Sequence, residues 1–184
     1  ARRCGGGGGP AGARAGVGSA VTVDRGLVAD APPGYQPVRA AALNTLSPRL
    51  AEAERHPEAL TAAEEAVSVY RRLAATSPVA YESLLARSLN NLSLRFAEVG
   101  RHSEALAAIE EAVTVYRRLV ANDPAGYKPV LAAALNNLSL RLAEAERHPA
   151  ALTAAAEAVS VYRRPAAARP VASESLLARA PNNP

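Results

Sequence analysis

The strongest constraint on this 184-residue chain is a segment that recurs every 46 residues. The strings ALNTLSPRLAEAERHPEAL, SLNNLSLRFAEVGRHSEAL and ALNNLSLRLAEAERHPAAL begin at Ala42, Ser88 and Ala134. A fixed period of this size is typical of small supersecondary units that each pack only against their neighbours. We therefore expect an array with a long exposed surface, which serves binding more often than catalysis.

Each repeat is predicted to form two helices. Apolar residues of the second repeat recur at gaps of three and four, as on one face of a helix: Leu85, Leu89, Leu92 and Phe96. Gly100 is expected to end this helix, and Ser103 is expected to cap the next one. In the first and third repeats, Pro57 and Pro149 stand where the second helix begins, a position that tolerates proline.

Proline and glycine mark the weak points of the array. Pro48 replaces a leucine of the other repeats in mid-helix and predicts a kink or break, because interior proline costs about 3 kcal/mol. Copies of the repeat at both ends are damaged, by Asp24 and Gly26 on one side and by Pro165 and Pro181 on the other. The predicted divisions are a disordered Gly-rich tail (1–18), a degenerate half-repeat (19–34), three repeats (35–164) and a degenerate partial repeat (165–184).

Composition narrows the class of protein further. With one Phe, no Trp and no Met, the core must consist mostly of Ala, Leu and Val. Cys4 is the single cysteine and cannot form an internal disulfide, and no apolar run approaches the ~18 residues of a membrane span. We therefore expect a soluble cytoplasmic protein without membrane association. Because no Met is present and the chain begins at Ala1, it is expected to be part of a larger protein.

The pattern of large and small residues resembles the tetratricopeptide repeat. In the second repeat, Leu89, Leu92-Ser93 and Phe96 match the first helix of that family, and Gly100 matches its turn glycine. The small–large–small pattern of the second helix matches Ala105, Ile109 and Ala112. The other two repeats offer Leu43, Leu46-Ser47, Leu50, Ala59, Ala63 and Ala66, and Leu135, Leu138-Ser139, Leu142, Ala151, Ala155 and Ala158.

This resemblance implies an all-α fold of antiparallel helix-pair repeats stacked as a right-handed α-solenoid. It also implies a protein–protein interaction scaffold that binds an extended peptide or a partner protein in its concave groove. The period of 46 residues is longer than the usual 34 of the family, and the phrase LNNLS before a long second helix resembles the kinesin light chain subtype. Similarity to that subtype implies that such asparagines line the groove.

The groove candidates lie on the predicted first helices. An amide both donates and accepts hydrogen bonds, so it can pair with the backbone of an extended peptide. The candidate groove residues are Asn44, Arg87, Asn90, Asn91, Leu94, Asn136, Asn137 and Leu140. The alternative is that the asparagines bond neighbouring helices or cap a local bend.

Arginines provide a second hypothesis for the groove. An acidic peptide could bind through Arg87, Arg95 and Arg141. The alternative is that Arg95 and Arg141 pair with glutamates of neighbouring helices. The sequence lacks the run of basic residues expected of a strong carboxylate clamp.

Catalytic and metal chemistry find no support in the residue patterns. The histidines His56, His102 and His148 lie one per repeat, so roughly 10 Å would separate them and one zinc ion could not hold all three. The run Gly5–Gly9 lacks the Gly-Lys-Ser/Thr of a phosphate loop. We therefore expect no enzyme activity, no metal and no cofactor.

Two other functions are also consistent with the sequence. Helical repeats can bind RNA, and the pI of about 9.6 prompts that idea, but the net charge is only +4 and aromatic stacking residues are scarce. The damaged ends also suggest a decayed array fragment without independent function. The oligomeric state is left open, because apolar ends could stack.

Overall fold

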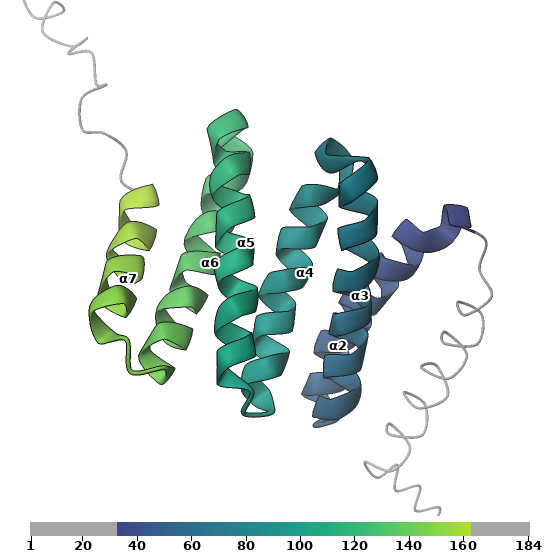
Figure 1. Cartoon of the computed structure of the whole chain (residues 1–184), viewed down its shortest axis with the longest axis horizontal. Helices are drawn as coiled ribbons and strands as arrows, with labels where there is room; N and C mark the ends of the chain where they lie inside the picture. The colour runs from purple at the N-terminus through teal and green to yellow at the C-terminus, as the bar shows by residue number, and fades with distance from the viewer. Residues whose placement is uncertain (1–32, 163–184) are drawn as a thin grey trace, which may run out of the picture.

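The computed structural model describes residues 33–162, and every regular element in that range is helical (Figure 1). The elements are a short 3-10 helix η1 (Pro33–Tyr35) and the α-helices α2 (Gln36–Glu52), α3 (His56–Thr76), α4 (Pro78–Glu98), α5 (His102–Asn122), α6 (Pro124–Glu144) and α7 (His148–Tyr162). The predicted all-α class is confirmed. The predictions for the Gly-rich tail, the half-repeat and the partial repeat fall on residues 1–32 and 163–184, outside the described range.

The helices form two layers. Each helix packs against the next one in the chain, so α2, α4 and α6 form one layer and α3, α5 and α7 form the other (Figure 1). The first helices of neighbouring repeats contact one another, whereas the second helices stay further apart. The array therefore curves with the first helices inside. We call the solvent-facing side of α2, α4 and α6 the inner face.

None of the helices in residues 33–162 is both long and apolar enough to span a bilayer.

Each helix pair turns through one residue in the left-handed region of φ. This residue is Gly100 in the second pair (φ 77°), and Glu54 and Glu146 hold the same place in the other two. The prediction that Gly100 ends a helix is confirmed, because α4 ends at Glu98 and the chain turns at Gly100. Glycine suits this position since it has no Cβ to clash there.

The predicted cap of the following helix was wrong. α5 begins at His102 with Arg101 in the cap position and with no side-chain cap bond, so Ser103 already lies in the first turn. The Arg101 side chain instead bonds Glu104. A serine within the first turn cannot reach the free N–H groups that a residue in the cap position satisfies.

The predicted break at Pro48 did not occur. α2 runs unbroken from Gln36 to Glu52 with Pro48 inside it. Proline removes one backbone hydrogen bond and introduces one ring clash. Leu43 and Leu50 are buried on either side of Pro48, and their packing holds the helix together across the defect. Tertiary packing here overrides the local preference.

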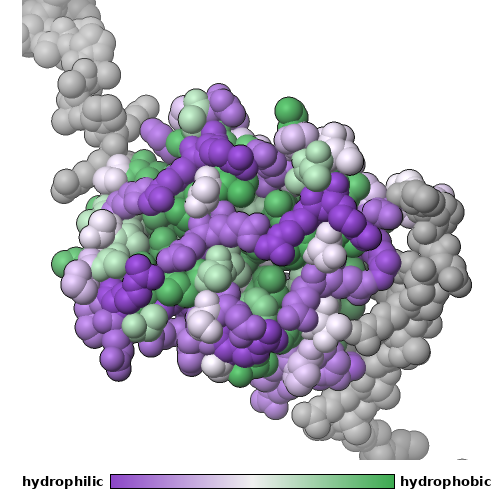
Figure 2. Space-filling view, in the orientation of Figure 1, coloured by the Kyte–Doolittle hydropathy of each residue, from purple (hydrophilic) through white to green (hydrophobic). Residues whose placement is uncertain are grey.

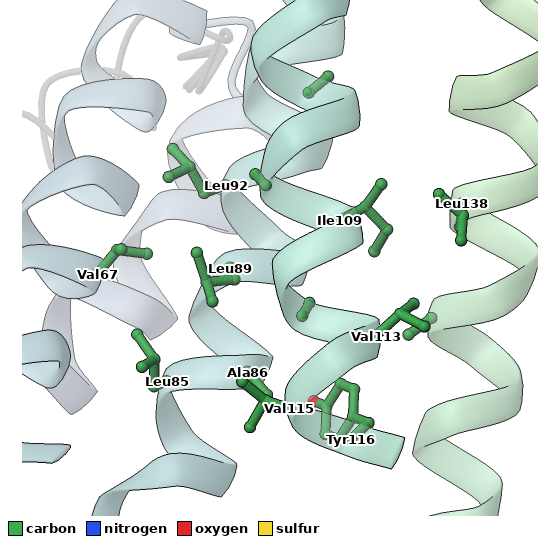
Figure 3. Packing of buried hydrophobic residues seen from close by; sticks show 14 of the residues in the cluster. Val67, Leu85, Ala86, Leu89, Leu92, Ile109, Val113, Val115, Tyr116 and Leu138 are labelled. Atoms are coloured by element: carbon green, nitrogen blue, oxygen red, sulfur yellow. The ribbon is translucent and has the colours of Figure 1, made fainter. Parts of the chain in front are cut away.

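The core consists of short side chains around a few large ones. Tyr70 is the largest of the fully buried side chains, and Leu89 and Ile109 are also fully buried. Ala86 and Ala112 have no exposed surface, which allows neighbouring helices to approach closely. In Figure 3 the side chains of α4 point toward Val67 of α3 on one side, and Val113 of α5 faces α6 on the other. The buried apolar residues form one large cluster that extends along the array to α7 and a smaller second cluster between α2 and α3.

Candidate functional site

The inner face presents an apolar strip along the array. Val38 on α2 and Val130 and Leu140 on α6 are exposed, and Leu94 on α4 is half-buried. Leu94 and Leu140 hold equivalent positions, whereas the first repeat has Pro48 there. Exposed branched side chains that recur on one face of an array are typical of a contact surface.

The asparagines form a ladder between repeats. The Asn91 Nδ2 donates to the Asn44 Oδ1 at 3.2 Å, and the Asn137 Nδ2 donates to the Asn90 Oδ1 at 2.9 Å. An amide carries both a donor and an acceptor, and the second repeat uses one of each: Asn91 donates to the first repeat and Asn90 accepts from the third. Four of the five candidate asparagines thus bond a neighbouring helix.

The two ends of the ladder differ in what they leave accessible. In the first repeat Asn44 is buried, with 7% of its surface exposed, and Thr45 bonds its own helix through the carbonyl of Ala41. At the other end Asn136 is exposed, and its side chain has no hydrogen bond to any described residue. Asn136 is therefore the asparagine whose side chain is most available to a partner.

Arg87 on α4 is an exposed cation beside the asparagines of the inner face. It lies one turn from Asn90 and Asn91, where the other repeats have Ala41 and Ala133. No acidic side chain in residues 33–162 pairs with it. Burial raises the pKa of Tyr70 and of Tyr116, and the positive charge of Arg87 partly counteracts both shifts. Arg87 therefore lies near tyrosines of two successive second helices.

Tyr116 makes the fold sensitive to alkaline pH. Burial raises the pKa of Tyr116 to about 12, against about 10 in an unfolded chain. Its neutral form is therefore favoured in the folded state. This stabilisation is fully present below about pH 10 and is lost as pH rises through about 12, with roughly 1 kcal/mol gone by about pH 11. Urea unfolding at several alkaline pH values will show this loss.

Tyr116→Phe provides the matched control for that titration. The variant keeps the ring but has no group to ionise, so its free energy of unfolding should fall less steeply above about pH 10. Parallel pH profiles for the two proteins would contradict the assignment to Tyr116.

Arg95 and Arg141 do not belong to the inner face. Both are buried, and each pairs with a glutamate of its own helix, Arg95 with Glu98 at 2.9 Å and Arg141 with Glu144 at 3.0 Å. The hypothesis that they bind an acidic peptide was therefore wrong. The prediction that they pair with glutamates is confirmed. The prediction that these glutamates lie on neighbouring helices was wrong, because each partner lies one turn away in the same helix.

The outer side of the array carries a furrow that the sequence analysis did not identify. It has a volume of about 590 Å³, with a floor of Leu89, Leu92 and Phe96 between α3 and α5. Two ion pairs cross it, Arg71 to Glu111 at 2.5 Å and Arg101 to Glu64 at 3.5 Å. In Figure 2 such hydrophilic side chains stretch across the apolar surface beneath them. The furrow is thus bridged by the protein itself.

These ion pairs recur in the next repeat. Arg117 pairs with Glu157 at 2.6 Å and Arg147 pairs with Glu110 at 3.4 Å. The sequence carries a signal for these pairs. In one kind of pair a Glu follows an Arg by 40 residues, and in the other an Arg follows a Glu by 37 residues. Both spacings occur again one repeat later. Each pair is exposed to solvent, so it contributes little to stability.

The histidines also connect repeats. The His56 Nδ1 lies 3.4 Å from the Glu98 Oε2, and the His102 Nδ1 lies 3.3 Å from the Glu144 Oε2. Within residues 33–162, no three His, Cys, Asp or Glu side chains gather as a metal would require. The described histidine contacts are therefore surface hydrogen bonds between neighbouring repeats.

Comparison with known families identifies the repeats. The model of the tetratricopeptide repeat family matches residues 39–75, 85–125 and 131–164, which is more than half of the chain. The three matches coincide with the three helix pairs of the structure. No curated protein is similar enough to be matched by sequence.

Proposed function

The chain belongs to the tetratricopeptide repeat family, and from that premise we propose that its inner face binds an extended segment of another protein. Repeats of this family generally mediate protein–protein interaction and are typically non-enzymatic scaffolds. The observation that carries the proposal is the exposed apolar strip of Val38, Val130 and Leu140 on the inner face. A partner that covered this strip would remove apolar surface from water.

The chemistry of the inner face favours a particular kind of segment. Apolar side chains of the partner would contact Leu94 and Leu140, and one carboxylate of the partner would pair with Arg87. The Asn136 amide can bond the backbone of the partner because no described residue occupies it. We therefore propose a mainly apolar peptide that carries a single acidic residue.

The distribution of charge favours a protein partner over a nucleic acid. Arginines on the outer side, such as Arg71, Arg101 and Arg117, are each paired with a glutamate. Phosphate binding depends on a surface of unpaired Lys and Arg side chains. On the inner face, exposed Arg87 stands among apolar and amide side chains, which suits a peptide better than a phosphate backbone.

We further propose that the array is of the kinesin light chain-like subtype. Support comes from the 46-residue period and from the Asn pairs at the centre of the first helices. Second helices of 21 residues in α3 and α5 account for part of the extra length. In such an array, the hydrogen bonds Asn44–Asn91 and Asn90–Asn137 would hold neighbouring first helices in position. The side chains beside these asparagines would then contact the bound peptide.

Two exposed leucines of the same repeat provide a matched test. Leu140 lies on the inner face and Leu152 lies on α7, and both are more than half exposed. Peptides selected from a random library against the purified chain are then titrated by fluorescence anisotropy. Leu140→Ala should weaken binding roughly tenfold, which corresponds to about 1.4 kcal/mol, whereas Leu152→Ala should leave it unchanged.

The asparagines separate binding from stability in the same assay. Asn136→Ala and Arg87→Ala should weaken peptide binding without a change in the melting temperature, because neither side chain bonds a described residue. Asn90→Ala should lower the melting temperature, since it leaves the amide of Asn137 without its acceptor. Equal affinities for the wild type and the Leu140, Asn136 and Arg87 variants would overturn the proposal.

A further inference from the structure

The furrow between α3 and α5, called the outer furrow from here on, has smaller wall residues than the equivalent surface of the next repeat. Ser68 of α3 and Ala107 of α5 line it, and both are exposed. One repeat later these positions carry Thr114 and Thr153, which are bulkier. The volume of about 590 Å³ lies within the range of small-molecule sites, roughly 300–1,000 Å³. The outer furrow is therefore large enough to hold a ligand.

One end of the outer furrow is closed by side chains that satisfy one another. α4 lies between α3 and α5 and provides the floor, which ends at Phe96, the single phenylalanine of the chain (Figure 1). Arg101 lies over this ring, 4.5 Å from its centroid. The Arg101 guanidinium donates to Glu104 at 2.7 Å and to Glu64 at 3.5 Å. This end therefore offers apolar surface, and its charged groups already have partners.

The other end of the outer furrow carries a cation without a partner. Arg72 lines this end and is exposed, and no acidic side chain in residues 33–162 pairs with it. The equivalent arginine of the next repeat, Arg118, pairs with Glu82 at 3.0 Å. One repeat before Glu82 the chain has Gln36, which carries no charge. Arg72 is therefore left free to bind an anion that enters the furrow.

The ion pairs that cross the outer furrow limit the width of a ligand but do not exclude one. The side chains of Arg71 and Glu111 are 54% and 40% exposed, and an exposed pair contributes about 0–1 kcal/mol, so these side chains can move aside at little cost. Glu64 and Arg72 mark the two ends of the furrow on α3, and the rise of a helix places them about 12 Å apart. A partner helix, about 10 Å across, would have to break all the crossing pairs at once. A slender ligand of about 12 Å would fit beneath them.

We propose that the outer furrow binds a small amphiphile with a slender aliphatic body and one carboxylate, as in a medium-chain fatty acid. The aliphatic body lies on the floor of Leu89, Leu92 and Phe96, where it is removed from water. The carboxylate pairs with Arg72 at the open end. The Arg71 side chain crosses above the bound chain. This site lies on the outer side of the array and does not depend on peptide binding by the inner face.

Octanoate and octanol share an aliphatic chain and differ in the head group, so together they test the proposal on the full 184-residue chain. In NMR titrations, octanoate should shift the backbone amide signals of α3 and α5 beside the furrow, and it should bind about tenfold more tightly than octanol. Arg72→Gln should remove this preference and leave the affinity for octanol unchanged. Arg118→Gln is the matched control and should change neither affinity, because Arg118 lies outside the outer furrow. Equal affinities of the wild type for the two compounds would overturn the proposal.

Filling the furrow identifies the site independently of charge. Ala107→Trp should abolish the binding of both compounds without lowering the melting temperature, because Ala107 is exposed. Thr153→Trp makes the same change one repeat later and should leave binding intact. Leu140→Ala on the inner face should also leave octanoate binding unchanged, so this proposal and the proposed peptide binding can fail separately. Equal effects of Ala107→Trp and Thr153→Trp, or signals that shift along the whole array, would show that octanoate has no specific site in the outer furrow.

Discussion

Replacing Tyr70 by alanine will lower the free energy of unfolding by about 3–5 kcal/mol. Tyr70 lies in the last third of α3 and has no exposed surface, although it is the largest of the fully buried side chains. Truncation removes its transfer free energy and leaves a cavity. The surrounding core is rich in Ala and Val, whose short side chains cannot move in to fill it.

Tyr35→Ala is the matched control for this prediction. Tyr35 lies at the start of the array and is 60% exposed, so its loss should change the free energy of unfolding by about 0.5 kcal/mol or less. Urea unfolding of the two variants measures the difference. Tyr70→Phe measures the contribution of the hydroxyl to the free energy of unfolding separately from that of the ring, since it keeps the ring and removes the hydroxyl. Similar losses for Tyr70→Ala and Tyr35→Ala would show that Tyr70 does not anchor the core.

Local pattern was sufficient to predict the fold. The spacing of Leu85, Leu89, Leu92 and Phe96 depends only on the helical period, and the structure buries all four. The turn at Gly100 depends only on the backbone freedom of one residue. Because each repeat packs against its neighbours alone, the two-helix unit and its period together determine the whole array.

The candidate site could be predicted only in part, because its contacts depend on the offset between repeats. The sequence shows two adjacent asparagines in a repeat. Which amide meets which is decided by the position of one helix along its neighbour, and the structure pairs Asn44 with Asn91 and Asn90 with Asn137. An offset of one residue would have produced different pairs. The outer ion pairs, such as Arg71 with Glu111, depend on the same offset.

The outcome at Pro48 has a different cause. Helix propensity is a weak preference that burial on either side can override, and here Leu43 and Leu50 hold the helix through the proline. The same proline should therefore still carry a cost that the packing offsets. Ser47, which precedes it, has a buried hydroxyl without a hydrogen-bond partner among the described residues, whereas the equivalent Ser93 donates to the carbonyl of Ala105 at 2.7 Å.

Pro48→Leu should accordingly stabilise the chain by about 2–3 kcal/mol. Removal of the ring restores the backbone hydrogen bond and relieves a clash worth about 3 kcal/mol, while the added freedom of the unfolded chain returns about 0.4–1 kcal/mol. Urea unfolding measures the gain. Pro57→Ser is the control, because Pro57 lies in the first turn of α3 and removes no helical hydrogen bond. A gain no larger than that of Pro57→Ser would mean that α2 accommodates Pro48 without strain.

The same substitution also bears on binding. Position 48 aligns with Leu94 and Leu140, so Pro48→Leu extends the apolar strip of the inner face into the first repeat. A peptide that uses the whole strip should then bind at least as tightly as before, because the new leucine adds apolar surface for it to cover. Weaker peptide binding by a more stable variant would show that the first repeat contributes to the groove through the shape that Pro48 imposes on α2, and not through an apolar strip.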